Sequence, residues 1–316
     1  MLAWPATSAL PLSGAPTAAA FLPGGRVLLD AHNAYPYEGR YSDRIDRALA
    51  TGLPVAIEQD LAWCPVGSSG TFAPVVSHET TCAGGEPTLE AHFFERVRPI
   101  MEQALSRGPS ADWPLITLNL DFKSNEPAHH AAVWALLQKY ERWLATAPNG
   151  GPPDRVAPLS PGPLLVLTGE DDAQEQTFAA PAVTRLRLFG AIHNLPAVNA
   201  DDPSELPRAA AATNYRRWWN HPWRVVEIGG PPKAGDWTDG DQRRLRAIVA
   251  DAHRHGLWIR FYTLNGHAPA AGQGWHHGYN FGSPEAAAAR WRAAGEAGVD
   301  FVATDQYEAF AAAVKR

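Results

Sequence analysis

Two apolar runs near the start of the chain, VLLDAHNAY at residues 27–35 and PVAIEQD at residues 54–60, indicate how the protein is built. The first run is followed at once by a histidine, and the second ends on two carboxylates. A segment of helical character, residues 42–50, separates the two runs and stops before a glycine. Strands that deliver polar side chains at their C-terminal ends are typical of the active site of an α/β barrel.

The same alternation of strand and helix continues along the chain. Further strands are predicted at residues 74–78, 115–121, 164–168, 184–189, 225–227, 258–264 and 301–304, and further helices at 89–106, 127–145, 239–255 and 284–297. The Pro- and Gly-rich residues 147–163 are expected to form a loop insertion. About eight strand–helix units predict a single TIM-type (β/α)8 barrel of the α/β class, with some distortion and loop insertions. A doubly wound open sheet is the main alternative, but no Gly-rich phosphate-binding fingerprint follows the first strand.

The length and charge of the chain limit its domain organisation and its partners. Its 316 residues suit one large domain or two small ones, and we expect an N-terminal extension at residues 1–22 and a barrel domain at residues 23–316. The extension is uncharged and resembles a segment that follows a removed signal peptide more than an intact one. The net charge of −6 comes without a block of like charges, so nucleic acid is not an expected partner. The sequence contains no run of about 18 apolar residues, so no transmembrane segment is predicted.

Two cysteines, Cys64 and Cys82, are close in sequence. In a secreted protein they could form one disulfide, which would stabilise the fold by about 3 kcal/mol through the loop that it closes. In a cytosolic protein they would be two unpaired thiols. Their proximity favours the disulfide, and with it a secreted or periplasmic location, although a cytoplasmic one stays open.

Three acidic residues form a candidate metal site. Glu58 and Asp60 stand two apart on a predicted strand, so they point to the same face. Two carboxylates so close together repel each other unless a cation lies between them, and a hard divalent cation such as Mg²⁺ or Ca²⁺ is the usual solution. Asp121, at the end of a later strand, could supply a third oxygen ligand, and Lys123 would share its face and could bind a phosphoryl oxygen. A solvent-facing carboxylate pair without a metal is the alternative.

Two histidines, His32 and His78, also stand at predicted strand ends. A lone histidine in such a place is more often structural than catalytic. Two histidines that bracket an acidic pair could act together, one taking a proton from an attacking hydroxyl and the other giving one to a leaving oxygen. That division suits phosphoester cleavage with a metal that stabilises the phosphoryl charge.

The motifs HNAY (32–35), EQD (58–60), VSHE (76–79) and DFK (121–123), in this order, resemble the superfamily of phosphatidylinositol-specific phospholipase C-like phosphodiesterases. This superfamily includes the glycerophosphodiester phosphodiesterases and the spider-venom-type phospholipases D. The segments GLWIRFYTLN (256–265) and GVDFVATD (298–305) are similar to the last two strands of its barrel. The resemblance implies an α/β barrel with two catalytic histidines and, in many branches, one divalent cation.

By this resemblance, His32 and His78 match the catalytic pair, and Lys123 matches a phosphate-binding lysine. The residues that match the metal ligands are Glu58, Asp60 and Asp121. Cys82 resembles a cysteine of the venom-type enzymes. Asn33 departs from the His-Arg-Gly of glycerophosphodiesterases, and Tyr262 stands where a Trp often packs near the substrate.

Three residues near the end of the chain complete the expected substrate-binding set. Arg260 and Tyr262 share one face of a predicted strand, and Asn265 lies just beyond its end. With Asn33 and Lys123, they are expected to contact the substrate.

These observations predict a monomeric, metal-dependent phosphodiesterase that acts on a small-molecule or phospholipid phosphodiester. The attacking hydroxyl could belong to the substrate or to water. One alternative is a catalytically silent barrel that binds a phosphorylated headgroup or a glycan. A glycosidase is a weaker alternative, because two acids on one strand face are too close and too parallel to flank a sugar bond in the usual way.

Overall fold

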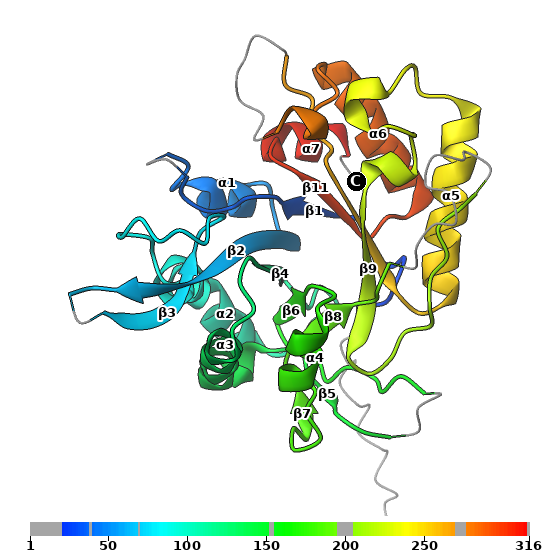
Figure 1. Cartoon of the computed structure of the whole chain (residues 1–316). Coiled ribbons are helices and arrows are strands. Elements are labelled where there is room, and N and C mark those ends of the chain that lie inside the picture. The colour runs from blue at the N-terminus through cyan, green and yellow to red at the C-terminus, as the bar shows by residue number, and fades with distance from the viewer. Residues whose placement is uncertain are drawn as a thin grey trace, which may run out of the picture.

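The computed structural model describes residues 21–37, 40–68, 70–151, 155–194, 205–268 and 276–314. Eight parallel strands close into a barrel, in the spatial order β1-β11-β10-β9-β8-β6-β4-β2, with β2 pairing again with β1. Figure 1 shows these strands around a common centre, with helices on the outside. The strands are β1 (Leu28–Ala31), β2 (Val55–Val66), β4 (Ile116–Phe122), β6 (Leu164–Thr168), β8 (Phe189–Ala191), β9 (Arg216–Pro222), β10 (Trp258–Tyr262) and β11 (Phe301–Thr304). The predicted single (β/α)8 barrel is therefore confirmed.

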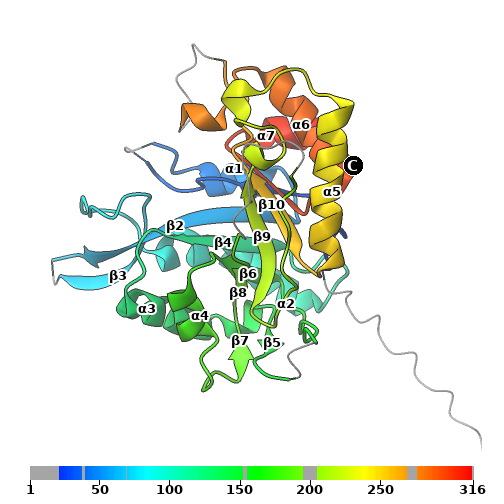
Figure 2. The same ribbon diagram turned by 45° about the vertical axis from the view of Figure 1, so that its right-hand side comes forward.

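Two pairings lie outside the ring. Strand β3 (Thr71–Val76) runs antiparallel to the second half of β2, and Figures 1 and 2 show this ribbon extending away from the barrel. Strands β5 (Ala147–Pro148) and β7 (Arg185–Leu186) form a small separate sheet. A disulfide joins Cys64 of β2 to Cys82, with the two Cα atoms 5.7 Å apart, so the paired alternative for the cysteines is the one observed.

Helices follow most of the barrel strands. They are α1 (Arg44–Ala50), α2 (Glu95–Arg107), α3 (Pro127–Lys139), α4 (Asp172–Phe178), α5 (Asp239–Arg254), α6 (Pro284–Ala297) and α7 (Tyr307–Ala313). Short helical turns lie at η1 (Glu90–Phe94), η2 (Glu141–Trp143), η3 (Trp223–Val225), η4 (Pro231–Lys233) and η6 (His277–Tyr279). Helix α5 begins with a capping box between Thr238 and Asp241, and α6 ends at Gly298, whose φ of 79° favours glycine. Among the described residues, no helix is both long and apolar enough to cross a bilayer.

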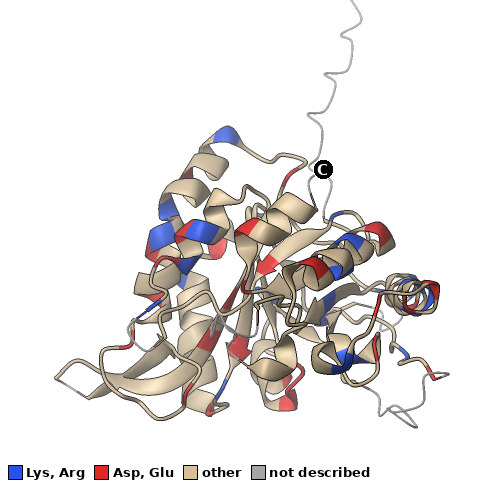
Figure 3. Cartoon of the chain, turned by 90° about the horizontal axis from the view of Figure 1, so that it is seen from above, with Lys and Arg blue, Asp and Glu red and all other residues tan. Residues whose placement is uncertain are grey.

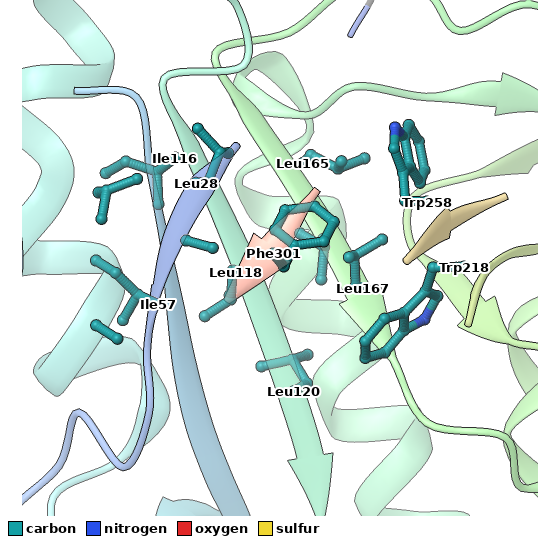
Figure 4. Packing of buried hydrophobic residues seen from close by; sticks show 14 of the residues in the cluster. Leu28, Ile57, Ile116, Leu118, Leu120, Leu165, Leu167, Trp218, Trp258 and Phe301 are labelled. Carbon is teal, nitrogen blue, oxygen red and sulfur yellow. The ribbon is translucent and has the colours of Figure 1, made fainter. Parts of the chain in front are cut away.

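Apolar side chains from the strands fill the core, as Figure 4 shows for Leu118, Leu167 and Phe301. Phe21, only 3% exposed, packs against the N-terminal part of the barrel, where its ring stacks on Trp258 with centroids 5.7 Å apart. Phe21, which falls within the predicted extension at residues 1–22, is therefore part of the packed barrel. Residues 1–20, on which most of that prediction falls, lie outside the described residues.

The predicted element boundaries fail most clearly in the middle of the chain. The strand predicted at 225–227 is wrong: the barrel strand is β9, and residues 223–225 form a helical turn. The strand predicted at 184–189 is two separate strands, β7 and β8, and the helix predicted at 127–145 ends at Lys139. β9 was missed because it carries two arginines, and the structure explains how they are buried. Arg216 donates to the Glu175 carboxylate at 2.7 Å, and Arg217 donates to two backbone carbonyls.

Candidate active site

A cavity of about 370 Å³ opens at the C-terminal ends of the barrel strands. Figure 3 shows acidic residues on strands at the centre of the molecule, whereas the surrounding helices carry charges of both signs. The polar and aromatic residues that line the cavity include His32, Asn33, Glu58, Asp60, His78, Asn119, Asp121, Lys123, Asn220, Arg260, Tyr262, His276 and Tyr279. Sequence positions from 32 to 279 therefore meet in one space, as expected of a barrel active site.

The three predicted metal ligands converge in this cavity. Glu58 and Asp60 lie on β2, and the register of the neighbouring strand places Asp121 directly beside Asp60. One carboxylate oxygen from each of the three residues lies within 4.8 Å of the others. Three carboxylates at this spacing are the hard oxygen donors that Mg²⁺ and Ca²⁺ prefer, so the residues fit a divalent cation.

Lys123 lies beside two of these carboxylates. Its Nζ atom is 3.0 Å from Asp60 Oδ2 and 2.7 Å from Asp121 Oδ2. Burial and the neighbouring carboxylates raise the pKa of Asp60 to about 8, and Lys123 opposes this rise.

Arg260 ties the acidic cluster to the interior of the barrel. Its guanidinium group donates to Asp30 and to Glu58 Oε1, the latter at 2.8 Å, and its third nitrogen donates to Asn220 Oδ1 at 3.1 Å. Burial opposes ionisation of Glu58, but Arg260 and His32 outweigh it, so the pKa of Glu58 lies below its usual value. Arg260 therefore lines the cavity and favours the charged forms of Glu58 and Asp30, although burial still leaves the pKa of Asp30 above its usual value.

His32 lies directly after β1, between two carboxylates. Its Nε2 atom is 3.5 Å from Glu58 Oε2, and its Nδ1 atom is 3.2 Å from Asp305 Oδ1. Burial lowers the pKa of His32, but the two carboxylates raise it more, to about 9. Asp305 is in turn held by Arg44 at 2.9 Å and by the Asn265 side-chain amide. A carboxylate that binds one ring nitrogen fixes the orientation of the imidazole and leaves the other nitrogen for proton transfer.

His78 lines the same cavity from the loop after β3, but it is far more exposed than His32. Half of its side-chain surface is accessible, and its Nδ1 atom lies 3.2 Å from Glu79 Oε1. The loop is attached to β2 by the disulfide at Cys82 and by the hydrogen bond from Ser77 N–H to Asp60 O at 3.0 Å. The two predicted catalytic histidines thus share one cavity and differ in burial.

Asn33 lies beside the acidic cluster in a backbone conformation with φ of 54°, which Asn tolerates better than most residues. Its N–H group donates to Glu58 Oε2 at 3.2 Å. The Tyr35 hydroxyl lies 2.7 Å from Asn33 Oδ1 and 2.8 Å from Asp60 Oδ2, so it supports both residues from below the cavity. The HNAY motif therefore contributes a histidine to the cavity and a scaffold for two carboxylates.

Not every predicted substrate-binding residue reaches the cavity. Tyr262 lines it, and the centroid of its ring lies 6.3 Å from that of the Tyr279 ring. Asn265 does not line it. Its side chain is only 1% exposed and is committed to Thr304 and Asp305, so it positions the carboxylate behind His32.

Sequence reasoning overlooked several residues that line or support the site: Asn119, Asn220, Tyr279, Arg44 and Asp305. Asp305 had a detectable signal, because it directly follows the apolar strand at 301–304, just as His32 follows the strand at 28–31. Asn119 had one too, because it stands on the predicted strand 115–121, two residues before Asp121. Arg44, Asn220 and Tyr279 lie in segments that give no such pattern.

Comparison with solved structures shows which known proteins have a similar fold. A calcium-dependent phosphoinositol-specific phospholipase C from a Pseudomonas species shares 15% identity over 91% of this chain and 91% of its own, with a TM-score of 0.50. A glycerophosphodiester phosphodiesterase from Agrobacterium tumefaciens shares 15% identity over 91% of this chain and 99% of its own, with a TM-score of 0.42. One from Parabacteroides distasonis shares 13% identity over 91% and 86%, with a TM-score of 0.44.

No protein-family model matches the chain, and no curated protein sequence matches it. At such low sequence identity, structural similarity establishes the fold alone. The chain therefore has the α/β-barrel fold seen in the phosphoinositol-specific phospholipase C, as the sequence motifs predicted.

Proposed function

We propose that this barrel is a metal-dependent phosphodiesterase that uses His32 and His78 as its proton carriers. The observation that carries the proposal is the convergence of three carboxylates, one lysine and two histidines on a single cavity at the C-terminal end of the barrel. The similarity of the fold to that of a calcium-dependent phospholipase C supports it.

Glu58, Asp60 and Asp121 are the residues that would hold one Mg²⁺ or Ca²⁺ ion. Such an ion, when bound, supplies Lewis-acid stabilisation to the charged phosphoryl group. Lys123, directly after β4, and Arg260, on β10, add positive charge to the cavity, and both are fixed by the carboxylates that they contact. A phosphodiester, which carries one negative charge, is the substrate class that this arrangement suits.

His32 is the better oriented of the two histidines. Asp305 holds its Nδ1 side, so its Nε2 atom faces the cavity beside Glu58. His78 stands at the open side, where solvent and a leaving oxygen have access. In the proposed reaction one histidine accepts the proton of the attacking hydroxyl, and the other donates a proton to the leaving oxygen.

The Cys64–Cys82 disulfide supports a secreted or periplasmic protein, because such bonds persist mainly in oxidising compartments.

The decisive experiment is a turnover assay with a panel of phosphodiesters in the presence of Mg²⁺, Ca²⁺ or EDTA. The panel contains glycerophosphodiesters, phosphoinositides and other phospholipids. We expect turnover that EDTA abolishes and that one of the two ions restores. Normal turnover by both His32→Ala and His78→Ala would overturn the proposed mechanism.

A catalytically silent barrel that binds a phosphorylated headgroup is the second candidate. The position of Lys123 favours it, because the ammonium group already contacts two of the candidate metal ligands. A protein that is stabilised by headgroup phosphates, but hydrolyses no member of the panel, would support this candidate.

A further inference from the structure

Asn119 is a buried side chain of the candidate active site that the proposed function leaves without a role. It stands on β4, is only 4% exposed and lines the cavity. Neither end of its amide has a hydrogen-bond partner among the described residues. The amides of Asn33, Asn220 and Asn265, by contrast, are each hydrogen-bonded to neighbouring side chains. Because a buried amide without a partner costs stability, this one is suited to a ligand that enters the cavity.

The position of Asn119 completes a square of four side chains on two neighbouring strands. In the parallel register of β2 and β4, Glu58 pairs with Asn119. Two residues further along, Asp60 pairs with Asp121. Side chains two residues apart share one face of a strand, and neighbouring strands lie about 4.8 Å apart, so all four side chains are close together. Three corners of the square are the candidate metal ligands, and the fourth is the amide.

The carbonyl oxygen of an Asn side chain is a metal ligand without charge. Ca²⁺ takes about six to eight oxygen ligands, and the carbonyls of Asn side chains are among them. A fourth carboxylate at this corner would add to the repulsion among the three already present. The Asn119 amide instead adds an oxygen and no negative charge, so it suits a cation that the carboxylates attract.

The number of protein oxygens distinguishes the two candidate ions. Mg²⁺ demands nearly octahedral geometry, keeps several of its waters and is usually held by one or two carboxylates. Ca²⁺ accepts more protein ligands in a more flexible geometry. Four side chains that offer oxygens to one position therefore favour Ca²⁺ over Mg²⁺.

We propose that Asn119 is a fourth protein ligand of the cation and that its amide oxygen makes the site selective for Ca²⁺. This role of Asn119 rests on the proposed function, since it requires the cation site formed by Glu58, Asp60 and Asp121. Removal of the amide then removes a metal ligand but no hydrogen bond within the described part of the protein.

Isothermal titration calorimetry of the metal-free protein with CaCl₂ and with MgCl₂ tests this role. We expect the wild type to bind Ca²⁺ at least about tenfold more tightly than Mg²⁺. Asn119→Leu should weaken Ca²⁺ binding by about tenfold or more, the scale on which changes around a metal site alter affinity, and Mg²⁺ binding by less than about threefold. Asn119→Asp, which keeps an oxygen at this position, should still bind Ca²⁺.

Thr117→Val is the matched control. Thr117 stands two residues before Asn119 on the same face of β4, is 1% exposed, and its hydroxyl has no hydrogen-bond partner in the described part of the chain. It does not line the cavity, so the variant should bind both ions like the wild type. Urea unfolding without metal adds a measurement that a purely structural Asn119 would change. Asn119→Leu should be at least as stable as the wild type, because it removes an amide without a partner.

Unchanged Ca²⁺ affinity in Asn119→Leu, or a preference of the wild type for Mg²⁺, would overturn the role of Asn119 and leave the cation site at the three carboxylates intact. A loss of metal-free stability in Asn119→Leu would overturn it as well, because the amide would then support the fold. A variant that binds Ca²⁺ normally, but is no longer stabilised by inorganic phosphate, would make Asn119 a donor to an anion instead. Absence of binding of either ion to the wild type would overturn the metal-dependent function itself.

Discussion

Arg260 Nη2 lies 2.8 Å from Glu58 Oε1, although the two residues are 202 positions apart in the sequence. Both side chains are at least 95% buried, and the same guanidinium group also contacts Asp30. The contact spans the barrel interior from β10 to β2, so one arginine links the strand that carries Glu58 and Asp60 to a strand near the end of the chain. A buried ion pair of this kind contributes little net stability, but loss of one partner leaves a buried charge unpaired.

Arg260→Met should therefore destabilise the protein strongly. We expect the free energy of unfolding to fall by about 3–5 kcal/mol, because Asp30 and Glu58 would both lose their cation. Urea unfolding monitored by tryptophan fluorescence measures this change.

Arg290 provides the matched control, because it forms an equally buried pair with Glu227 outside the cavity. Arg290→Met should cost a similar free energy, yet leave the response to divalent cations intact. If Arg260→Met unfolds at the wild-type urea concentration, the structural role given to Arg260 is wrong.

The acidic cluster could be predicted from the sequence because its residues follow from the strands that carry them. Glu58 and Asp60 share a strand face through the two-residue period, and Asp121 ends the next parallel strand of the barrel. The roles of Arg44 and Asp305 could not be predicted in this way. Their contact is made where β11 pairs with β1, and that closure brings together residues 261 positions apart.

In the middle of the chain, the sequence did not reveal one of the barrel strands. Apolar periodicity identifies strands whose two faces are buried by apolar neighbours, such as residues 164–168. Strand β9 is also buried at Arg216 and Arg217, but through ion pairs and hydrogen bonds with distant segments. Its sequence therefore looks like a polar connection, and the prediction moved the strand to the more apolar residues 225–227.

Removal of one carboxylate should abolish stabilisation by divalent cations. At a free ion concentration of about 100 times the dissociation constant, a cation that binds only the folded protein adds about 2.7 kcal/mol to the free energy of unfolding. In Asp121→Asn we expect most of this gain to disappear. Thermal unfolding with increasing Mg²⁺ or Ca²⁺ measures the effect.

Asp121 is suited to this test because its side chain is about half exposed, at 48%, so the substitution should not unfold the protein. Asp112→Asn, at an exposed position outside the cavity, serves as the control. An unchanged cation response in Asp121→Asn would remove this residue from the candidate metal site.

Loss of either histidine should reduce turnover of a phosphodiester by at least about 10²-fold, the usual scale of acid–base catalysis. The two variants should differ in stability. His78→Ala should unfold at the wild-type temperature, because half of the His78 side-chain surface is exposed. His32→Ala should unfold at a lower temperature, because it removes a cation that lies between Glu58 and Asp305.

His193→Ala is the control for the histidine variants. The His193 side chain is 52% exposed and, like His78, contacts one carboxylate, but it does not line the cavity of the candidate active site. It should retain wild-type turnover. Steady-state kinetics and differential scanning calorimetry on the three variants separate a loss of chemistry from a loss of folding.

The disulfide should contribute measurably to stability. For a bond between residues 18 positions apart, the chain-entropy model predicts about 3 kcal/mol. Cys64→Ala combined with Cys82→Ala should lower the free energy of unfolding by roughly this amount. A reducing agent should lower the unfolding temperature of the wild type and leave that of the double variant unchanged; an equal effect on both would indicate that the bond is not formed in solution.

His221 should make the protein less stable in acid. Burial lowers the pKa of His221 to about 3, from an ordinary value of 6.5 in the unfolded chain. Between these two values the unfolded chain binds a proton that the folded protein does not, so stability falls as the pH drops below about 6.5. At pH 5 the loss from this residue alone is about 2 kcal/mol relative to pH 8. In His221→Phe, whose ring can keep the contacts with Trp219 and Phe261, urea unfolding at the two pH values should show a correspondingly smaller loss than in the wild type. An equal loss in both proteins would mean that His221 is protonated in the folded state, despite its burial.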